Sequence, residues 1–201
     1  LVLRWAVVNA LNNFMEDPFP TVAGPLIFDS RIEPIEDFEW EKMLPTAVIY
    51  TDYDKDGWQH QTIGQNAPRL LTVTFELLMA QVTRTPDDPN TYEIKQPNTD
   101  AEVEASLDIF EMQIARALRQ PNEATEVWKY LMEKWVNVIS RRGATVEGAQ
   151  RLAARQIIVE AQTPRAPKVG ILSPIIDAFL TRLETQMDYP SDLIAVVREG
   201  Y

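Results

Sequence analysis

The sequence predicts an α+β fold, in which an antiparallel or mixed sheet of about four strands is backed by helices, with an extra helical elaboration near the C-terminal end. Two patterns carry this prediction. In residues 69–80, apolar and polar side chains alternate with a period of two, as in an antiparallel strand with one buried face. In residues 101–118, apolar side chains recur every three or four positions, which is typical of an amphipathic helix.

The chain has 201 residues, of which 45% are hydrophobic and 24% charged, so we expect one domain with a buried core. It contains no cysteine, which excludes disulfides, thiolate metal sites and cysteine nucleophiles. No apolar run approaches the roughly 20 residues that cross a bilayer, and residues 1–15 show no signal-peptide pattern. Because Leu1 is the first residue, we expect that the initiator methionine is missing or that a non-standard start codon is used.

The formal net charge is −11, with an isoelectric point of about 4.6. This balance argues against a surface that binds nucleic-acid phosphates, where lysine and arginine must replace counterions. An acidic surface suits a path along which DNA moves without adhering, because like charges repel. One local basic patch remains open as an alternative, around Arg141, Arg142, Arg151 and Arg155.

The N-terminal part begins with a predicted helix over residues 2–15, which ends before Pro18. A short strand is predicted over 26–29, followed by a connection over 31–43.

A hairpin is predicted next, because residues 45–51 and 69–80 are rich in β-branched and aromatic residues. The polar segment 52–68 between them is its long, exposed tip. In the second strand, one face carries Leu71, Val73, Phe75, Leu77 and Met79, and the other carries Thr72, Thr74 and Glu76.

Residues 85–98 hold three prolines, two asparagines and two aspartates, which predicts a loop. Thr99 and Glu102 match a capping box at the start of the helix over 101–118. A further helix is predicted over 122–140, with Arg142-Gly143 ending it.

Trp128 and Trp135 are predicted to lie on the buried stripe of that further helix. From 146 to 163 helical and alternating patterns both fit, and we assign a strand to 155–162. Ser173-Pro174 predicts the start of a helix that stops before Pro190, because proline is favoured at the first helical position.

The segment Asp52-x-Asp54-x-Asp56-Gly57 matches the first half of an EF-hand calcium loop. The twelfth position, which should be a bidentate glutamate, is Ile63, and the flanking elements are predicted strands. A solvated acidic turn is therefore the favoured interpretation.

His60 is the only histidine, and no phosphate loop, nucleophile elbow or zinc-binding HExxH motif is present. Five carboxylates between 33 and 41 are interpreted as a solvated acidic surface. We therefore predict that the protein is not an enzyme and needs neither cofactor nor metal. Trp58 either folds back on its own hairpin or anchors a partner, and both interpretations stay open.

Several segments resemble, in order and spacing, the tail terminator proteins of long-tailed bacteriophages. They are the first helix, residues 27–34 (IFDSRIEP), 44–52 (LPTAVIYTD) and 69–76 (RLLTVTFE), the helix over 100–118, and a returning strand at 154–161. The resemblance covers 1–120 and 154–163 of a single domain over 1–201. It leaves 121–145 and 164–201 as helical elaborations.

The resemblance implies an α+β domain that forms a ring, typically a hexamer, on the last ring of the tail tube, where it stops polymerisation and offers a surface for the neck. The implied partners are further copies of the chain, the tail tube protein, the sheath if the tail is contractile, and neck or head-completion proteins. Genome DNA would pass through the lumen without specific binding, and no membrane is involved. The implied location is the virion, after assembly in the host bacterial cytoplasm.

No catalytic residues carry over from the family, so the site candidates are interface residues. They lie in the 52–68 segment and in the 27–34 motif: Asp52, Asp54, Asp56, Trp58, His60, Asp29 and Arg31. The alternatives are another neck or head-completion protein, a soluble ligand- or calcium-binding module, and an enzyme that uses the carboxylate run.

Overall fold

The computed structural model describes residues 1–30, 45–56, 69–79, 81–85, 88–95, 100–147, 150–163, 172–187 and 189–200. Five α-helices and seven strands lie in this part of the chain. In order they are α1 (Val2–Asn12), the 3-10 turn η1 (Asn13–Met15), β1 (Ile27–Asp29), β2 (Thr46–Asp56), β3 (Arg69–Met79), β4 (Gln81–Thr85), β5 (Asp88–Lys95), α3 (Asp100–Ala117), α4 (Glu123–Leu131), β6 (Lys134–Glu147), β7 (Gln150–Thr163), α5 (Pro174–Gln186) and α6 (Ser191–Glu199).

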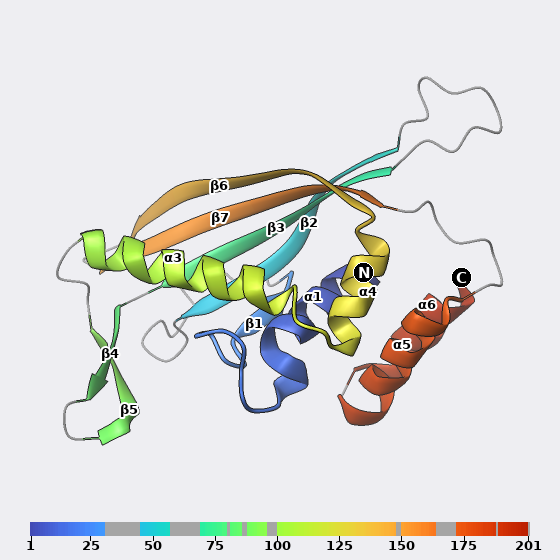
Figure 1. Cartoon of the computed structure of the whole chain (residues 1–201), viewed down its shortest axis with the longest axis horizontal. Coiled ribbons are helices and arrows are strands. Elements are labelled where there is room, and N and C mark those ends of the chain that lie inside the picture. The colour runs from blue at the N-terminus through green and yellow to red at the C-terminus, as the bar shows by residue number, and fades with distance from the viewer. Residues whose placement is uncertain are drawn as a thin grey trace.

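The protein has the predicted α+β fold, built on one mixed sheet with the strand order β1-β2-β3-β7-β6. β1 runs parallel to β2, and the other three ladders are antiparallel. β4 and β5 form a separate two-stranded sheet that stands away from the large one in Figure 1. The large sheet thus has five strands, compared with the four that the sequence indicated.

The predicted hairpin is formed by β2 and β3, and the alternation in β3 gives its faces as expected. Val73, Phe75, Leu77 and Met79 are buried, whereas Glu76 on the other face is exposed. β2 is longer than predicted: its pairing with β3 continues to Asp56 opposite Arg69, with an irregularity between Thr51 and Tyr53. The start of the predicted loop is therefore strand.

The helix predicted over 122–140 is wrong beyond Leu131. α4 ends there, and β6 begins at Lys134 and pairs with β7, which contains the correctly predicted strand over 155–162. The chain from Trp135 to Ile139 is dense in aromatic and β-branched residues, which favour a strand when a partner strand is at hand. This strand belongs to the main sheet, so the region 121–145 is not a purely helical elaboration.

The two tryptophans accordingly differ in burial. Trp128 on α4 is 1% exposed, whereas Trp135 on β6 is 41% exposed and is not a core residue as predicted. Their rings meet edge to face with centroids 6.1 Å apart, so Trp135 covers the end of the core next to α4.

The loop predicted over 85–98 is also wrong, because β4 and β5 pair antiparallel from Gln81 opposite Lys95 to Thr85 opposite Asp88. Proline cannot donate to a ladder, but it is tolerated in an edge strand. Each strand of a two-stranded sheet is an edge strand, so Pro89 within β5 does not prevent the pairing.

The first helix stops at Asn12, three residues earlier than predicted. Asn13, Phe14 and Met15 follow with φ of 51°, 54° and 64°, in the left-handed region that non-glycine residues rarely adopt. The reversal turns Phe14 into the core, where its ring meets Phe179 of α5 edge to face at 6.1 Å. Burial of this ring is the gain that offsets the strained backbone.

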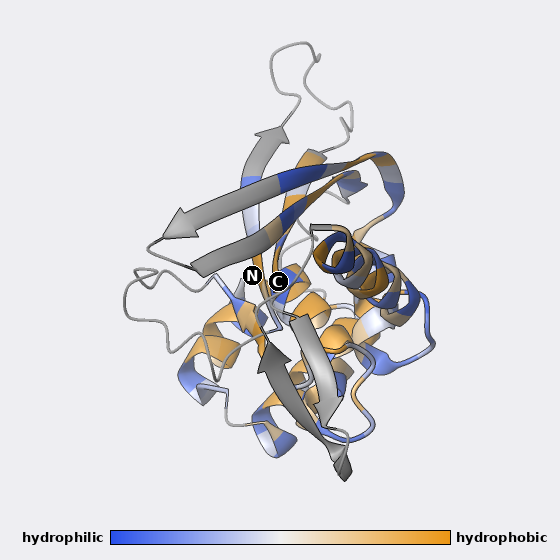
Figure 2. Cartoon of the chain, turned by 90° about the vertical axis from the view of Figure 1, so that its left-hand side faces the viewer, coloured by the Kyte–Doolittle hydropathy of each residue, from blue (hydrophilic) through white to orange (hydrophobic). Residues whose placement is uncertain are grey.

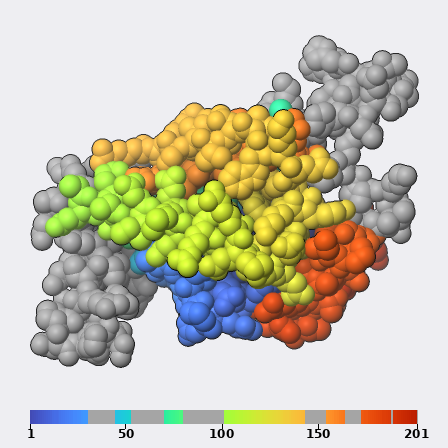
Figure 3. All heavy atoms as spheres, viewed as in Figure 1, coloured from blue at the N-terminus to red at the C-terminus, as the bar shows by residue number. Residues whose placement is uncertain are grey.

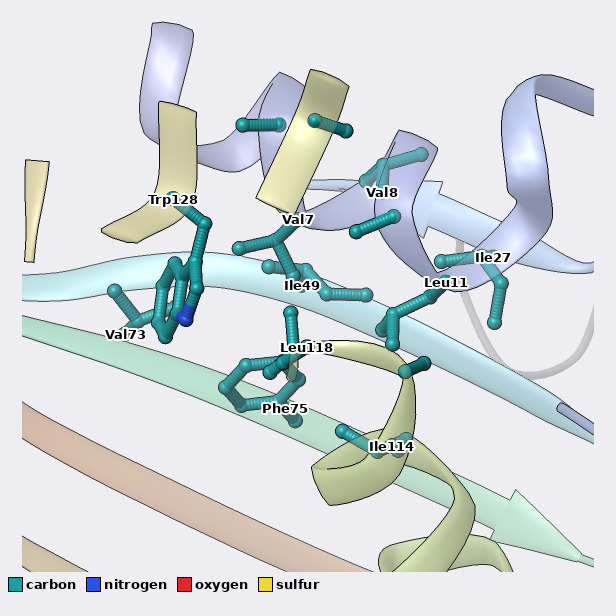
Figure 4. Close-up of a cluster of buried hydrophobic side chains, with 14 of the residues drawn as sticks. Val7, Val8, Leu11, Ile27, Ile49, Val73, Phe75, Ile114, Leu118 and Trp128 are labelled. Carbon is teal, nitrogen blue, oxygen red and sulfur yellow. The ribbon is translucent and has the colours of Figure 1, made fainter. Parts of the chain in front are cut away.

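The helices α1, α3 and α4 cover one face of the sheet, which is called the helix face below (Figure 1). Figure 4 shows how the core forms there: Phe75 and Val73 of β3 meet Leu118 and Trp128, while Val7 of α1 lies over Ile49 of β2. In the turned view of Figure 2, hydrophobic segments are concentrated where helices and sheet meet.

The helix ends are fixed by different means. Thr99, predicted to cap α3, lies outside the described residues. A capping box is present on α4 instead, where Asn122 Oδ1 accepts from the backbone N–H of Thr125 and Thr125 Oγ1 accepts from that of Asn122. α5 begins at Pro174, as predicted, although the side chain of Ser173 makes no capping bond.

Candidate interaction surfaces

The sheet face opposite the helices, called the outer face below, carries a polar network across three strands. The Tyr50 hydroxyl of β2 donates to Glu76 Oε1 of β3 at 2.6 Å, and Gln156 Nε2 of β7 donates to the Tyr50 hydroxyl at 3.1 Å. Thr74 Oγ1 donates to Asp52 Oδ2 at 2.8 Å on the same face. These bonds give the outer face a defined pattern of polar groups.

Burial, followed by the hydrogen bond to Glu76, raises the pKa of Tyr50 well above its ordinary value of 10.0. The folded state therefore holds the phenol proton more tightly than the unfolded chain. This contributes stability that is fully present below about pH 10 and is lost as the pH rises toward the raised pKa.

Tyr50→Phe should lower the free energy of unfolding by about 1 kcal/mol at pH 7. It should also make the fall of this free energy between about pH 9 and 11 smaller than in the wild type. Urea unfolding across this pH range measures both effects. Tyr130→Phe is the matched control, because Tyr130 is exposed on α4. Identical pH dependence in wild type and Tyr50→Phe would show that the network does not hold the Tyr50 proton.

The three aspartates of the calcium-like motif lie in β2, and not in a loop. Asp52 is exposed on the outer face and accepts the bond from Thr74, and β2 continues in extended conformation through Asp54 and Asp56. An EF-hand loop folds its carboxylates around one ion, whereas paired strand backbone spreads successive residues along a line. This geometry removes the main argument for the calcium-binding alternative.

The other interface candidates fall in two groups. Asp29 of β1 is tied to Arg4 of α1, with Nε and Oδ1 2.6 Å apart, and Arg4 also donates to Thr51 Oγ1 at 3.2 Å. Asp29 thus links α1 to the sheet within its own chain. Arg31, Trp58 and His60 lie outside the described residues, as do the 33–41 carboxylates and the connection predicted over 31–43.

Two arginines of the basic patch considered from the sequence, Arg155 and Arg142, are neutralised by carboxylates of α3. The Arg155 guanidinium donates to Asp108 at 2.6 Å, to Glu104 at 2.8 Å and to Glu111 at 2.9 Å, and its side chain is only 11% exposed. Arg142 also pairs with Glu104, at 2.6 Å. These charges fasten α3 to β7 and β6, so they are not offered to a nucleic acid.

The strand β6 is the surface feature that sequence reasoning missed. In the described part of the chain it pairs with β7 alone, so its other edge has no partner strand. Its apolar side chains remain accessible: Val136 is 51% and Val138 48% exposed, beside Trp135. The cluster of aromatic and β-branched residues was the available signal, but its helix-like spacing obscured it.

Two surface hollows lie near the N-terminal turn. One, between that turn and the end of α3, is lined by amides, ring side chains and one cation: Asn13, Pro18, Phe19, Pro20, Gln113, Arg116, Gln120 and Asn122. The other surrounds Arg182, which is bound to Glu123 at 3.1 Å and lies over the Phe14 ring. The hydroxyls that line the second hollow, Thr181 and Thr185, donate to backbone carbonyls and not to a carboxylate that could act as a general base.

Among the described residues, no group of three or more His, Asp or Glu side chains is placed to hold a metal ion. The helices in that same part of the chain are all too short or too polar to cross a membrane.

No protein-family model matches the chain, and no curated protein sequence matches it.

Proposed function

We propose that this protein is a tail terminator of a long-tailed bacteriophage. It is a structural virion protein whose ring caps the tail tube, ends tail polymerisation and offers the surface that joins the neck and head. The observation that supports this best is the chain order of packed elements. α1, β1, the β2–β3 hairpin, α3 and the returning β7 follow one another as the resemblance implies, and they share one core.

The shape of the hairpin supports a role in assembly. β1 pairs with β2 only at Ala47, Val48 and Ile49, so from Tyr50 to Asp56 β2 is the outermost strand in the described part of the sheet, while β3 stays paired with β7 as far as Arg69 (Figure 1). β4 and β5 stand at the opposite end of the sheet. A chain with an uncovered stretch of β2 at one end and a second hairpin at the other has separate surfaces for different neighbours, as a heterologous ring requires.

The charge of the chain suits a conduit for DNA. With a net charge of −11, a ring of several copies would carry a strongly acidic surface. Such a lumen repels phosphates, so the genome passes without adhering. The arginines of β6 and β7 that bind α3 carboxylates do not reverse this balance.

Deleting the gene from its source genome tests the proposal. Loss of a terminator should give particles with tails of uncontrolled length, measured by electron microscopy of negatively stained lysates. A plasmid copy of the wild-type gene should restore uniform tails. Tails of normal length that are detached from heads would instead identify a neck or head-completion protein. Normal, infectious particles would refute the structural role altogether.

A further inference from the structure

The two sides of the large sheet end in edges of opposite charge. We call residues 134–142 of β6 the basic edge, because they carry Lys134, Arg141 and Arg142 and no acidic residue. We call residues 50–56 of β2 the acidic edge, because they carry three aspartates and one lysine. In the described part of the chain, this stretch pairs only with β3, because β1 ends its pairing at Ile49.

The basic edge has the properties of a strand that is covered by another chain. β6 is 14 residues long, with unpaired backbone groups along one side in the described part of the chain. Monomeric proteins protect such edges with short strands or inward-pointing charges, since a long apolar edge invites pairing with another chain. Here Trp135, Val136 and Val138 are exposed instead, and Figure 3 shows β6 in gold along the margin of the face that carries α3.

Strand direction makes the two edges compatible. β3 runs antiparallel to β2, β7 antiparallel to β3, and β6 antiparallel to β7, so β6 runs opposite to β2. A second copy placed in line with the sheet therefore presents β6 to β2 in antiparallel orientation, like most ladders within the sheet.

We propose that the basic edge of one copy pairs antiparallel with the acidic edge of the next copy, joining the sheets head to tail. This inference rests on the ring function proposed above and names its contact between subunits. A contact between two different patches repeats from copy to copy and closes into a ring when the rotation allows. Lys134 and Arg141 of one edge then lie on the same face as Asp52 of the other, which favours this order of subunits over others.

Charge also favours this contact over the simplest alternative, in which two basic edges pair with each other. Two basic edges paired with each other would bring Lys134 and Arg141 of both copies together, and like charges on paired strands are destabilising. Lys134 and Arg141 have no ion-pair partner among the described residues, so they are available to a neighbour. A second copy supplies Asp52 on the same face.

The absence of native cysteine allows a direct test by disulfide trapping of the purified full chain. Asp52 lies on the outer face, and so do Asn137, Ile139 and Arg141, which pair with outer-face residues of β7. Asp52→Cys is combined with Asn137→Cys, Ile139→Cys or Arg141→Cys, which covers three registers. Each variant is oxidised and separated on a non-reducing gel, after its melting temperature has been compared with wild type.

At least one of the three outer-face pairs should give a ladder of dimers, trimers and higher species. The matched control is Asp52→Cys with Val138→Cys, because Val138 lies opposite Val159 on the helix face. Cysteines on opposite faces cannot meet the geometry of a disulfide, so this pair should lose the ladder. In the cysteine-free chain, which keeps Asp52, Lys134→Glu combined with Arg141→Glu should also weaken the self-association measured by analytical ultracentrifugation.

Three results would overturn the inference. The first is that no outer-face pair cross-links better than the control. The second is that the charge reversal has no effect. The third is that Ile139→Cys alone gives dimers as efficiently as the cysteine pairs and no larger species, which would indicate pairing of two basic edges. The result is separable from the proposed function. Tails of uncontrolled length after gene deletion, with no ladder, would retain the terminator and reject this contact. A ladder of cross-linked species, together with tails of normal length after gene deletion, would retain this contact and reject the terminator function.

Discussion

Phe75→Asp and Phe110→Asp are each expected to abolish the cooperative unfolding transition of the protein. Phe75 lies in the middle of β3 and is 1% exposed, and Phe110 lies on the sheet-facing side of α3 and is fully buried. Removing a buried phenyl ring costs about 3–5 kcal/mol, and an unpaired buried carboxylate adds several more. The sum approaches or exceeds the roughly 5–15 kcal/mol that stabilises a typical domain.

Two control variants distinguish the effect of a buried charge from the effect of changing the residue at that position. Phe75→Leu should keep the fold and lose only about 1–2 kcal/mol, because it conserves most of the apolar volume. Met112→Asp places the same carboxylate on the exposed side of α3, where Met112 is 63% accessible, and should melt like wild type. Thermal unfolding followed by circular dichroism measures all four variants. Wild-type melting temperatures for both buried aspartates would show that the core is assigned incorrectly.

The parts of the fold that could be predicted are those whose pattern agrees with their packing. In β3 every second residue from Leu71 to Met79 points to the helix face, so the alternation reports which side chains face the helices, although Thr72 and Thr74 on the outer face are buried as well. In α3 the buried residues Leu107, Phe110 and Ile114 follow helical spacing for the same reason. Local sequence was sufficient there because the large apolar side chains of each element lie on the one face that packs in the core.

The misassigned elements are those in which a distant partner decides the structure. Trp128, Leu131, Trp135 and Val138 have helical spacing, yet β7 pairs with the chain from Lys134 onward and converts it to strand. The turn at Asn13 and Phe14 could not be predicted either, because its strained backbone is stabilised by contacts with α5, more than a hundred residues away.

The candidate surfaces also divide into features that local sequence indicated and features that depend on a distant strand. Asp52 was found from its motif, but the motif indicated a loop, and only the ladder with β3 shows that this segment is the edge of a sheet. The opposite edge has no motif at all. Its significance comes from the strand order, which brings β2 and β6 to opposite sides of one sheet and leaves both with unpaired stretches in the described residues.

Arg155→Met is expected to destabilise the protein by about 2–3 kcal/mol, the second largest effect. The side chain is nearly buried between β7 and α3, and its guanidinium is bound to Glu104, Asp108 and Glu111. Methionine retains much of the apolar stem but leaves three carboxylates side by side with Arg142 as their remaining cation. The carboxylates that lose this partner are 29–68% exposed, so solvent screens part of their repulsion and the expected cost stays below that of a fully buried pair.

Arg141→Met is the matched control, since Arg141 is exposed on the outer face of β6 and should change the free energy of unfolding by no more than about 0.5 kcal/mol. Glu111→Gln provides the sharper test. In the wild type it removes a partner of Arg155 and should destabilise, whereas in the Arg155→Met variant it relieves repulsion and should stabilise. Urea unfolding of the four proteins measures this coupling. If Glu111→Gln has the same sign and size in both backgrounds, the cluster does not fasten α3 to the sheet.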